Sequence, residues 1–305
     1  MSLLSKFVLP TKLLITVDVM KGENMKGFHI RQMNLEEVQL AVDWAAKEGW
    51  NPGLNDAHQY FFADPTGFLI GSLDGEPIAC ISVIKYDHSF GFLGFYIVKP
   101  EYRGKGYGIQ IWRKGMVYLE GCNVALDGVV DQQGNYMRSG FALSHRNIRY
   151  QSLTASSLYD QETIKPLHSV SLDLAQQYLL PFFPSHREAF YQSWLFQPNS
   201  VALYAGTPSD IKGIGVIRPC KDGYKIAPLF ADSMSIANML YTGLTSSVNP
   251  DQPVFLDVPE TNKAAIELAS NHQMTACFET ARMYTKGSPD IALGRTFGVT
   301  SFEIG

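Results

Sequence analysis

The sequence predicts an α+β protein of two tandem domains, each a mixed sheet flanked by helices. Three strand-like segments follow one another between residues 67 and 98, and the short turns between them favour antiparallel pairing. A glycine-rich turn and an amphipathic helix then lead to a further strand, which is typical of a parallel connection. The same order of elements returns in weaker form from Lys165 onward, which indicates a duplication.

Length and composition set the broad class. The chain has 305 residues, enough for two ordinary domains, and its 46% hydrophobic content supports full cores. A formal net charge of -4 with 18% charged residues argues against nucleic-acid and membrane partners. The four cysteines are far apart and the seven histidines are scattered, which favours a cytoplasmic protein with reduced thiols and no metal site. The oligomeric state is left open between a monomer and a homodimer.

Four segments are predicted along the chain. Residues 1–24 form an N-terminal extension, whose apolar run ends at Asp18 with no small-residue cleavage site after it. That run predicts neither a signal peptide nor a membrane span. The first domain covers residues 25–155, a linker covers 156–165, and the second domain covers 166–305.

The first domain opens with a strand over residues 28–33. Asn34 is a good helix N-cap, and Glu37 completes a capping box for the helix that follows. Asp74-Gly75 predicts a tight hairpin between two strands. The remaining elements are expected in this order: helices at 35–48 and near 55–62, strands at 67–73, 76–86 and 89–98, a helix at 106–120, a strand at 123–130, a short helix at 134–140 and a strand at 146–155.

A glycine-rich turn precedes the helix 106–120. Pro100 ends the strand before it, because proline has no N–H for the ladder. The turn presents several backbone N–H groups at a helix N-terminus, where an anion is favoured, and Arg103 and Lys105 add positive charge. It therefore predicts a phosphate-binding site built on three glycines that allow a tight backbone turn, Gly104, Gly106 and Gly108.

Two common phosphate motifs compete for this turn. A Walker loop is excluded, because Gly108 is followed by Ile109 and not by Lys-Ser/Thr. A dinucleotide fingerprint is harder to dismiss, since Asp127 follows Gly106 by about 20 residues, where a ribose-binding acid would stand. Against it, Ile109 occupies the third glycine position and residues 100–102 separate the strand from the glycines.

The pattern Val98-x-Pro100-x-x-Arg103-Gly104-x-Gly106-x-Gly108 resembles the coenzyme A pyrophosphate loop of the GNAT N-acetyltransferase superfamily. A second segment, Tyr136-x-x-x-Gly140-Phe141, resembles the Tyr-x-x-x-Gly-Phe signature that follows in that family. The resemblance covers residues 28–155. It implies a GNAT-type sheet in each domain, with the acetyl-CoA loop in the first and a degenerate copy in the second.

The resemblance implies a role for several residues. Acetyl-CoA would insert between the fourth and fifth strands, with backbone contacts from Ile97 and Val98 and with the Val98 N–H polarising the thioester carbonyl. Asn135 would contact the cofactor. Tyr136 would be the acid for the departing thiolate, since a phenol with a reference pKa of about 10 stays protonated at neutral pH. The pyrophosphate would be held by the loop, namely Arg103, Gly104, Lys105, Gly106, Tyr107 and Gly108.

The general base is less defined. Many family members carry a glutamate on the fourth strand, but residues 92–96 contain no carboxylate. Asp127, on the strand parallel to it, is the first choice, and a chain of waters is an equal alternative. The other candidates are Glu48, Asp56, Asp87 and His88.

The acceptor site is expected at the connection after the first helix, where this family usually recognises its acceptor. Trp50, Asn51 and Asp56 would line a pocket for a small polar amine.

The second half repeats the order but not the chemistry. Val216-Ile217-Arg218 corresponds to Val83-Ile84-Lys85, but the segment around Pro228 lacks the glycines and Ala269 stands at the tyrosine position. The second domain is therefore predicted not to turn over acetyl-CoA. It would either cover the acceptor cleft, through Arg282 and Tyr284, or serve only as structural mass.

Together these features predict an acetyl-CoA-dependent N-acetyltransferase of a small-molecule amine. A noncatalytic acetyl-CoA-binding sensor and a nicotinamide-dinucleotide enzyme stay open as alternatives.

Overall fold

The structure is a computed structural model that describes residues 27–155 and 162–305. The predicted extension, residues 1–24, lies outside the described residues, and so does most of the predicted linker. Strand β7 already begins at Ile164, inside the range expected for that linker. None of the helices in the described part of the chain is long and apolar enough to cross a membrane.

The first half follows the predicted order closely. Asn34 Oδ1 accepts a hydrogen bond from the Glu37 N–H at 2.9 Å, and the Glu37 carboxylate accepts one from the Asn34 N–H at 3.0 Å, so the capping box is confirmed. Asp74 and Gly75 both have positive φ, as a two-residue hairpin turn requires. The elements are β1 (Phe28–Gln32), α1 (Leu35–Lys47), α2 (Asp56–Phe61), β2 (Phe68–Leu73), β3 (Glu76–Lys85), β4 (Phe90–Val98), the 3-10 helix η1 (Pro100–Tyr102), α3 (Tyr107–Tyr118), β5 (Asn123–Val129), η2 (Val130–Gln132), α4 (Gln133–Arg138) and β6 (Ala142–Leu153).

The second half repeats this sequence of elements, which supports the predicted duplication. Apart from the 3-10 helices, which differ, the described part of the second half adds a short strand near the end of the sequence, β13. The elements are β7 (Ile164–Pro166), η3 (Leu167–Ser169), α5 (Leu172–Leu179), η4 (Leu180–Phe182), α6 (Glu188–Trp194), β8 (Val201–Thr207), β9 (Asp210–Pro219), β10 (Tyr224–Ala231), α7 (Met234–Ser246), β11 (Pro253–Pro259), α8 (Lys263–Asn271), β12 (Thr275–Tyr284), η5 (Leu293–Arg295) and β13 (Thr296–Gly298).

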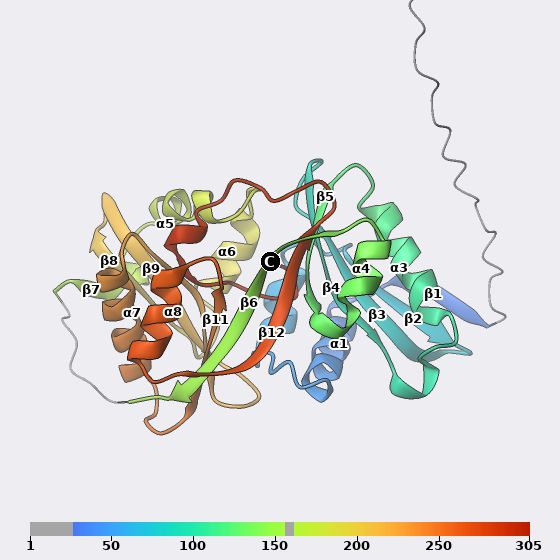
Figure 1. Cartoon of the computed structure of the whole chain (residues 1–305), viewed down its shortest axis with the longest axis horizontal. Helices are drawn as coiled ribbons and strands as arrows, with labels where there is room; N and C mark the ends of the chain where they lie inside the picture. Colours follow the sequence, from blue (N-terminus) through green and yellow to red (C-terminus); the bar gives the residue numbers. More distant parts are fainter. Residues whose placement is uncertain (1–26, 156–161) are drawn as a thin grey trace, which may run out of the picture.

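The two halves share one continuous mixed sheet of 13 strands, so the predicted α+β class is confirmed. Its order is β1-β2-β3-β4-β5-β12-β6-β11-β10-β9-β8-β7, with β13 off this path on β10. Each half therefore gives its last long strand to the other: β12 pairs with β5, and β6 pairs with β11. Figure 1 shows these two strands crossing the centre of the molecule. The sequence boundary near residue 155 thus does not separate two independent sheets.

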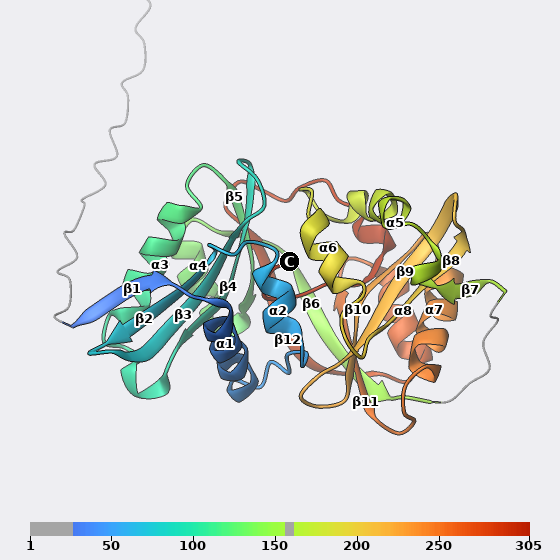
Figure 2. The same cartoon turned by 180° about the vertical axis from the view of Figure 1, so that it is seen from behind.

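Helices cover both faces of the sheet. Helices α3, α4, α7 and α8 lie on the face seen in Figure 1, whereas α1, α2, α5 and α6 lie on the opposite face, seen in Figure 2. On that second face a single hydrophobic core runs from α1 to α6 and includes Val42, Tyr60 and Trp194. Tyr60 on α2 stacks on Trp194 on α6, with ring centroids 5.7 Å apart. The two halves are therefore joined by a common core as well as by exchanged strands.

Strands β4 and β5 pair in parallel, as predicted, but only along their first part. The paired residues run from Phe90 opposite Asn123 to Leu93 opposite Leu126. At Phe95 the backbone takes a φ of +45°, and the register of β4 against β3 shifts nearby. A bulge of this kind bends a strand and breaks its pairing, so the two strands separate beyond this point.

The equivalent pair in the second half also separates, but there a strand fills the opening. Strands β10 and β11 pair in parallel from Tyr224 to Ile226. Beyond this, β13 pairs antiparallel with β10, and the Val299 N–H donates to the Asp257 carbonyl of β11 at 2.9 Å. A side chain at Gly298 would meet Leu256 at 2.6 Å, so this strand fits closely into the gap.

Candidate functional site

The separation of β4 and β5 opens into a cavity of about 670 Å³. One wall is β4 from Leu93 to Val98, the opposite wall is β5 from Leu126 to Val129, and the glycine-rich turn forms one end. The other end is built by the second half, through β12 and the residues that follow β13. The lining includes ten of the residues singled out from the sequence as site candidates, namely Glu48, Trp50, Ile97, Val98, Arg103, Gly104, Gly106, Gly108, Asp127 and Tyr136.

The glycine-rich turn has the geometry that an anion site requires. Gly104 and Gly106 have φ of +73° and +84°, where other residues are strained, and Gly106 is the N-cap of α3 without a side-chain cap. A Cβ at Gly108 would lie 2.6 Å from the Tyr96 hydroxyl, so glycine lets the helix approach β4. Among the described residues, no acceptor is found for the N–H groups of residues 104–108. These amides are therefore free to bind a phosphate.

The charged residues of the turn differ in position. Arg103 lies at the cavity, where its Nε donates to the Val98 carbonyl at 2.8 Å and its guanidinium pairs with Glu48. Lys105 is exposed over the Tyr102 ring and does not line the cavity. Tyr107 packs in the core against Phe28, so its side chain is structural and only its N–H faces the turn.

The free edge of β4 faces the cavity. The Lys99 N–H donates to the Ile78 carbonyl of β3 at 2.9 Å. Because N–H groups alternate in direction along a strand, the Val98 N–H turns away from β3 and toward the gap. Ile97 and Val98 thus lie where an extended ligand would add to the edge.

Tyr136 lies on α4 and lines the cavity near β5. Its ring stacks on Trp112 with centroids 5.8 Å apart, and a Cβ at Gly128 would meet it at 2.1 Å. Glycine at 128 therefore makes room for this ring. Burial raises the pKa of the Tyr136 phenol to about 12, so the hydroxyl stays protonated and is a donor at physiological pH.

The structure argues against Asp127 as the general base. Its Oδ1 accepts hydrogen bonds from Arg282 Nε at 3.0 Å and from Asn147 Nδ2 at 2.8 Å, and its other oxygen also pairs with Arg282. Both carboxylate oxygens are thus already bonded to side chains of the protein, so neither is left without a donor for an incoming amine. The second half repeats the arrangement: Asp257 on β11 forms the same paired contact with Arg149 on β6. The prediction that Asp127 is the base is therefore corrected: its contact with Arg282 helps to hold the exchanged strand β12 against β5.

Two of the predicted acceptor residues are also corrected. Asp56 is fully buried, accepts two hydrogen bonds from Arg218 at 3.0 and 2.9 Å, and does not line the cavity. Asn51 has its side chain bonded to the backbone of Asp222 in the second half. Both residues join the halves, and only Trp50 reaches the cavity.

The remaining candidates have other partners. Asn135 lies at the surface, bonds to Gln132 and Arg138, and is not part of the cavity lining. Asp87 caps the turn before β4 by accepting from the N–H groups of Ser89 and Phe90. The His88 side chain is exposed on the same turn.

Sequence reasoning missed the residues that the second half brings to the cavity. Phe278 and Thr280 come from β12, and Phe302 and Glu303 come from the segment after β13, residues 299–305, which we call the tail. The first two arrive on the exchanged strand β12 and the last two on the tail, and the sequence contains no local pattern for either arrangement. The available signal was a lone glutamate in an apolar context, Phe302-Glu303-Ile304.

The tail lies between the two halves and is fixed by contacts to both. Ser82 Oγ donates to the Glu303 carbonyl at 3.1 Å, and the Tyr86 hydroxyl donates to the Ile304 carbonyl at 2.7 Å. From the second half, Arg187 donates to the Thr300 hydroxyl at 3.0 Å and to the Gly305 carbonyl at 2.6 Å. The position of Glu303 at the cavity is therefore well defined.

Comparison with known proteins agrees with this geometry. Residues 32–141 match the Acetyltransferase (GNAT) family, and residues 177–298 match an acetyltransferase (GNAT) domain. The holothin acyltransferase of Pseudoalteromonas sp. (strain SANK 73390) is 26% identical over 272 residues, which cover 89% of this chain and 92% of the relative.

Solved structures show the same fold. A putative acetyltransferase from Pyrococcus horikoshii superposes with a TM-score of 0.78 at 19% identity and covers 92% of this chain and 97% of its own. A tandem GNAT protein from the clavulanic acid biosynthesis pathway gives a TM-score of 0.56 at 8% identity, covering 86% of this chain and 100% of its own. With a GNAT match in each half and a tandem GNAT protein among its structural neighbours, this chain belongs to the GNAT superfamily of acyltransferases as a two-domain, tandem member.

Proposed function

We propose that this protein is an acetyl-CoA-dependent N-acetyltransferase that acts on the primary amine of a small molecule, with the chemistry confined to the first half. The reaction would convert the amine and acetyl-CoA into an acetamide and coenzyme A. The acyl transfer in the name of the Pseudoalteromonas relative supports the reaction class. The acceptor's identity depends on the cavity end built by both halves.

The observation that carries the proposal is the open gap between β4 and β5, with free amides at the N-terminus of α3. The residues fit coenzyme A in two respects. The turn at Gly104 and Gly106 offers unpaired N–H groups and a helix dipole to a pyrophosphate. The edge of β4 offers backbone groups to an extended pantetheine arm.

The chain's own residues supply two of the needs of acyl transfer. Acetyl-CoA, when bound, supplies an activated acyl group and a thiol leaving group. The Val98 N–H, which faces the gap, is placed to donate to the oxygen on which negative charge develops. Tyr136 keeps its proton because burial raises its pKa to about 12, so it can donate to a departing thiolate.

Calorimetry and an amine screen test the proposal together. Titration with acetyl-CoA should show one site per chain, whereas NAD should give no binding signal. A library of primary amines should then contain acceptors that cause free thiol release, with mass spectrometry showing an added acetyl group on nitrogen. Binding of acetyl-CoA without transfer to any amine would favour the sensor alternative, and binding of NAD alone would overturn the assignment.

A further inference from the structure

We propose that Glu303, carried into the cavity by the tail, receives the ammonium group of the acceptor and takes its proton. This inference rests on the proposed function, because it names the acceptor's charge and its recognition at the same site. It assigns a direct chemical role to a residue of the second half. The candidate bases identified from the sequence all lie in the first half, with Asp127 as the first choice.

The protein provides hydrogen-bond donors to only one of the two carboxylate oxygens of Glu303. Its Oε2 accepts from the Ser301 hydroxyl at 2.7 Å and from the Tyr60 hydroxyl at 3.0 Å. In residues 27–155 and 162–305, Oε1 has no hydrogen-bond donor, and the residue lines the cavity while only 4% exposed overall. Oε1 is not among the fully enclosed side-chain atoms that lack a partner in the described residues, so it is open to the cavity and can accept from a donor that enters with the ligand.

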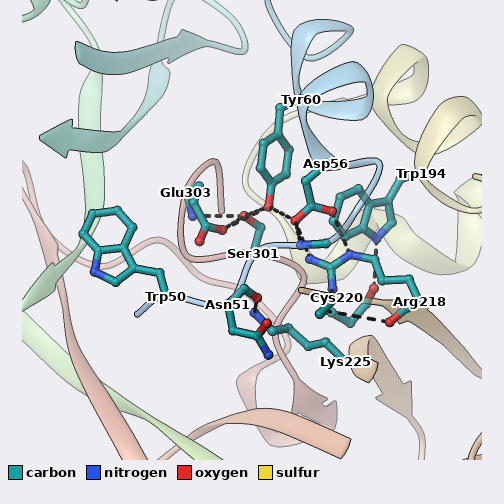
Figure 3. Close-up of polar contacts among 12 residues, drawn as sticks. Trp50, Asn51, Asp56, Tyr60, Trp194, Arg218, Cys220, Lys225, Ser301 and Glu303 are labelled. Atoms are coloured by element: carbon teal, nitrogen blue, oxygen red, sulfur yellow. Dashed lines mark hydrogen bonds and ion pairs between the residues drawn. The ribbon is translucent and has the colours of Figure 1, made fainter. Parts of the chain in front are cut away.

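The charges around Glu303 point to a cation. Two buried ion pairs lie nearby, Arg218 with Asp56 and Arg149 with Asp257. Glu303, by contrast, forms no ion pair with any described residue and is held by hydroxyl groups alone. Figure 3 shows this chain of contacts, from Glu303 through Tyr60 to Asp56 and Arg218. Arg149 and Arg218 attract Glu303 only at longer range, and an ammonium ion at Oε1 would supply a counter-charge in direct contact.

The tail places Glu303 beside the reacting part of the cavity. A Cβ at Gly94 would lie 2.1 Å from the Glu303 carbonyl, so glycine at this position lets the tail lie against β4. Gly94 is four residues before Val98, on the strand whose free edge faces the gap. Glu303 is therefore next to the strand that would hold the acyl donor, and not at the mouth of the cavity where the glycine-rich turn lies.

Aromatic side chains surround this end of the cavity. Trp50 comes from the first half, and Phe278 and Phe302 come from the second. Arg149 lies against both phenylalanine rings, 5.6 Å from the centre of Phe278 and 5.1 Å from that of Phe302, which fixes them in place. This lining favours a primary amine on a flat apolar body.

The proton transfer is balanced within the site. The ammonium N–H bond breaks, its proton goes to Oε1 of Glu303, and the electron pair stays on nitrogen, which becomes a neutral amine. The carboxylic acid formed then returns the proton to solvent after turnover. The Tyr60 hydroxyl lies 3.0 Å from Glu303 and 3.1 Å from Asp56, and its pKa is raised well above the usual value by burial. Tyr60 is therefore a positioning residue that stays protonated.

The test compares binding of amines with binding of their neutral analogues. Benzylamine, phenethylamine and tryptamine, each with its matching alcohol, are titrated into wild type and Glu303→Gln at neutral pH, with and without coenzyme A. Wild type should prefer at least one amine over its alcohol by about 10-fold or more, and Glu303→Gln should lose that preference while its affinity for acetyl-CoA is unchanged. Glu279→Gln, an exposed glutamate on β12, is the matched control and should behave as wild type.

Turnover gives a second readout. With any amine found to accept acetyl groups, Glu303→Gln should reduce kcat/KM by about 100-fold or more at neutral pH. The defect should shrink as pH rises, because the free amine becomes abundant in solution without a base. Glu303→Asp, which keeps the charge, should retain the amine preference with reduced turnover.

The inference is overturned if wild type prefers no amine over its alcohol, or if the preference survives in Glu303→Gln. It is equally overturned if Glu303→Gln keeps wild-type turnover across the pH range. If either result is obtained and wild type still transfers acetyl groups to an amine, only the role of Glu303 is overturned and the proposed function holds. Absence of transfer to any amine by wild type removes the proposed function itself.

Discussion

Each half of this protein has a cleft where two parallel strands separate, and this cleft is open in the first half but filled in the second. In the first half, β4 and β5 separate beyond Leu93 and leave a cavity of about 670 Å³. In the second half, β10 and β11 separate in the same way, but β13 occupies the opening and pairs with β10. The helix N-termini differ too: α3 begins at an uncapped Gly106, whereas the first turn of α7 is capped by the Ser233 hydroxyl.

The difference lies in what occupies the gap between the two separated strands of each half. Backbone groups at the edge of a separated strand must find partners, whether from a ligand or from the protein. The second half satisfies them with its own β13, and the chain after this strand forms the tail that brings Glu303 to the open cleft. The segment that fills the cleft of the second half thus also holds in place the tail, which lines the cavity of the first half.

The largest expected effect comes from the turn at the open cleft. In Gly106→Pro the N–H is lost and φ is forced from +84° to a negative value, so acetyl-CoA affinity should fall by at least about 100-fold. In Gly106→Ala the N–H stays and the strain costs about 1–2 kcal/mol, which corresponds to about 10-fold. Calorimetry measures both.

The matched change at the closed cleft is Ser233→Ala. It removes the hydroxyl cap of α7 and should lower the free energy of unfolding by about 1 kcal/mol without changing acetyl-CoA affinity. One binding site should remain per chain. A second site that survives in Gly106→Pro would contradict the view that β13 closes the second cleft.

The next prediction concerns the two aspartates that each form an ion pair with a buried arginine. Asp127→Asn and Asp257→Asn each leave a buried arginine without its partner, and each should lower the free energy of unfolding by about 3–5 kcal/mol. Denaturant unfolding compares them. At temperatures where both variants are folded, kcat should fall by about 10-fold or less in either. A loss of about 100-fold or more in Asp127→Asn alone would restore Asp127 as the base.

Tyr136→Phe should act on turnover alone. The phenol of Tyr136 makes no hydrogen bond to any other described residue, so its removal should leave stability and acetyl-CoA affinity nearly unchanged. Loss of the proton donor should lower kcat by about 100-fold, measured by thiol release. The control is Tyr241→Phe on α7, whose hydroxyl contacts Ser152 of the exchanged strand β6 at 3.2 Å. Equal kcat values in both variants would remove Tyr136 from the mechanism.

The sequence alone predicted the local parts of this structure well. The capping box at Asn34, the turn at Asp74-Gly75 and the glycine-rich turn are short patterns with a direct physical cause, and each is found where expected. The parallel pairing of β4 and β5 followed from the right-handed connection through α3. These features depend on a few neighbouring residues.

The sequence could not predict the parts that depend on the relative placement of the halves. Asp127 and Asp257 look alike in the sequence as polar residues within apolar strands, and only the exchange of β6 and β12 reveals their arginine partners. Asp56 was expected at the acceptor site for its place in the first connection, but Arg218, 162 residues away, holds it in the interior. Glu303 reaches the cavity by the same long-range route.

The last effect is the pH dependence of stability at the exchanged strands. His145 on β6 is 3% exposed, and burial, with a further contribution from Arg282, lowers its pKa to about 4. The unfolded chain has the ordinary value of about 6.5, so it takes up a proton between pH 6.5 and pH 4 while the folded protein does not. Stability should therefore fall as pH is lowered through this window, by about 2–3 kcal/mol from this group.

The histidine variants separate this contribution from that of other groups. His145→Gln keeps a polar group beside Ser144 but cannot titrate, so urea midpoints measured from pH 7 to pH 4.5 should change less than in wild type. His272 also has its pKa lowered by burial and adds to the wild-type slope, so His272→Gln should reduce the slope separately. The exposed His29 on β1 is the control, and His29→Gln should retain the full slope. If His145→Gln kept the wild-type slope, the loss of stability in acid would have to come from groups outside the exchanged strands.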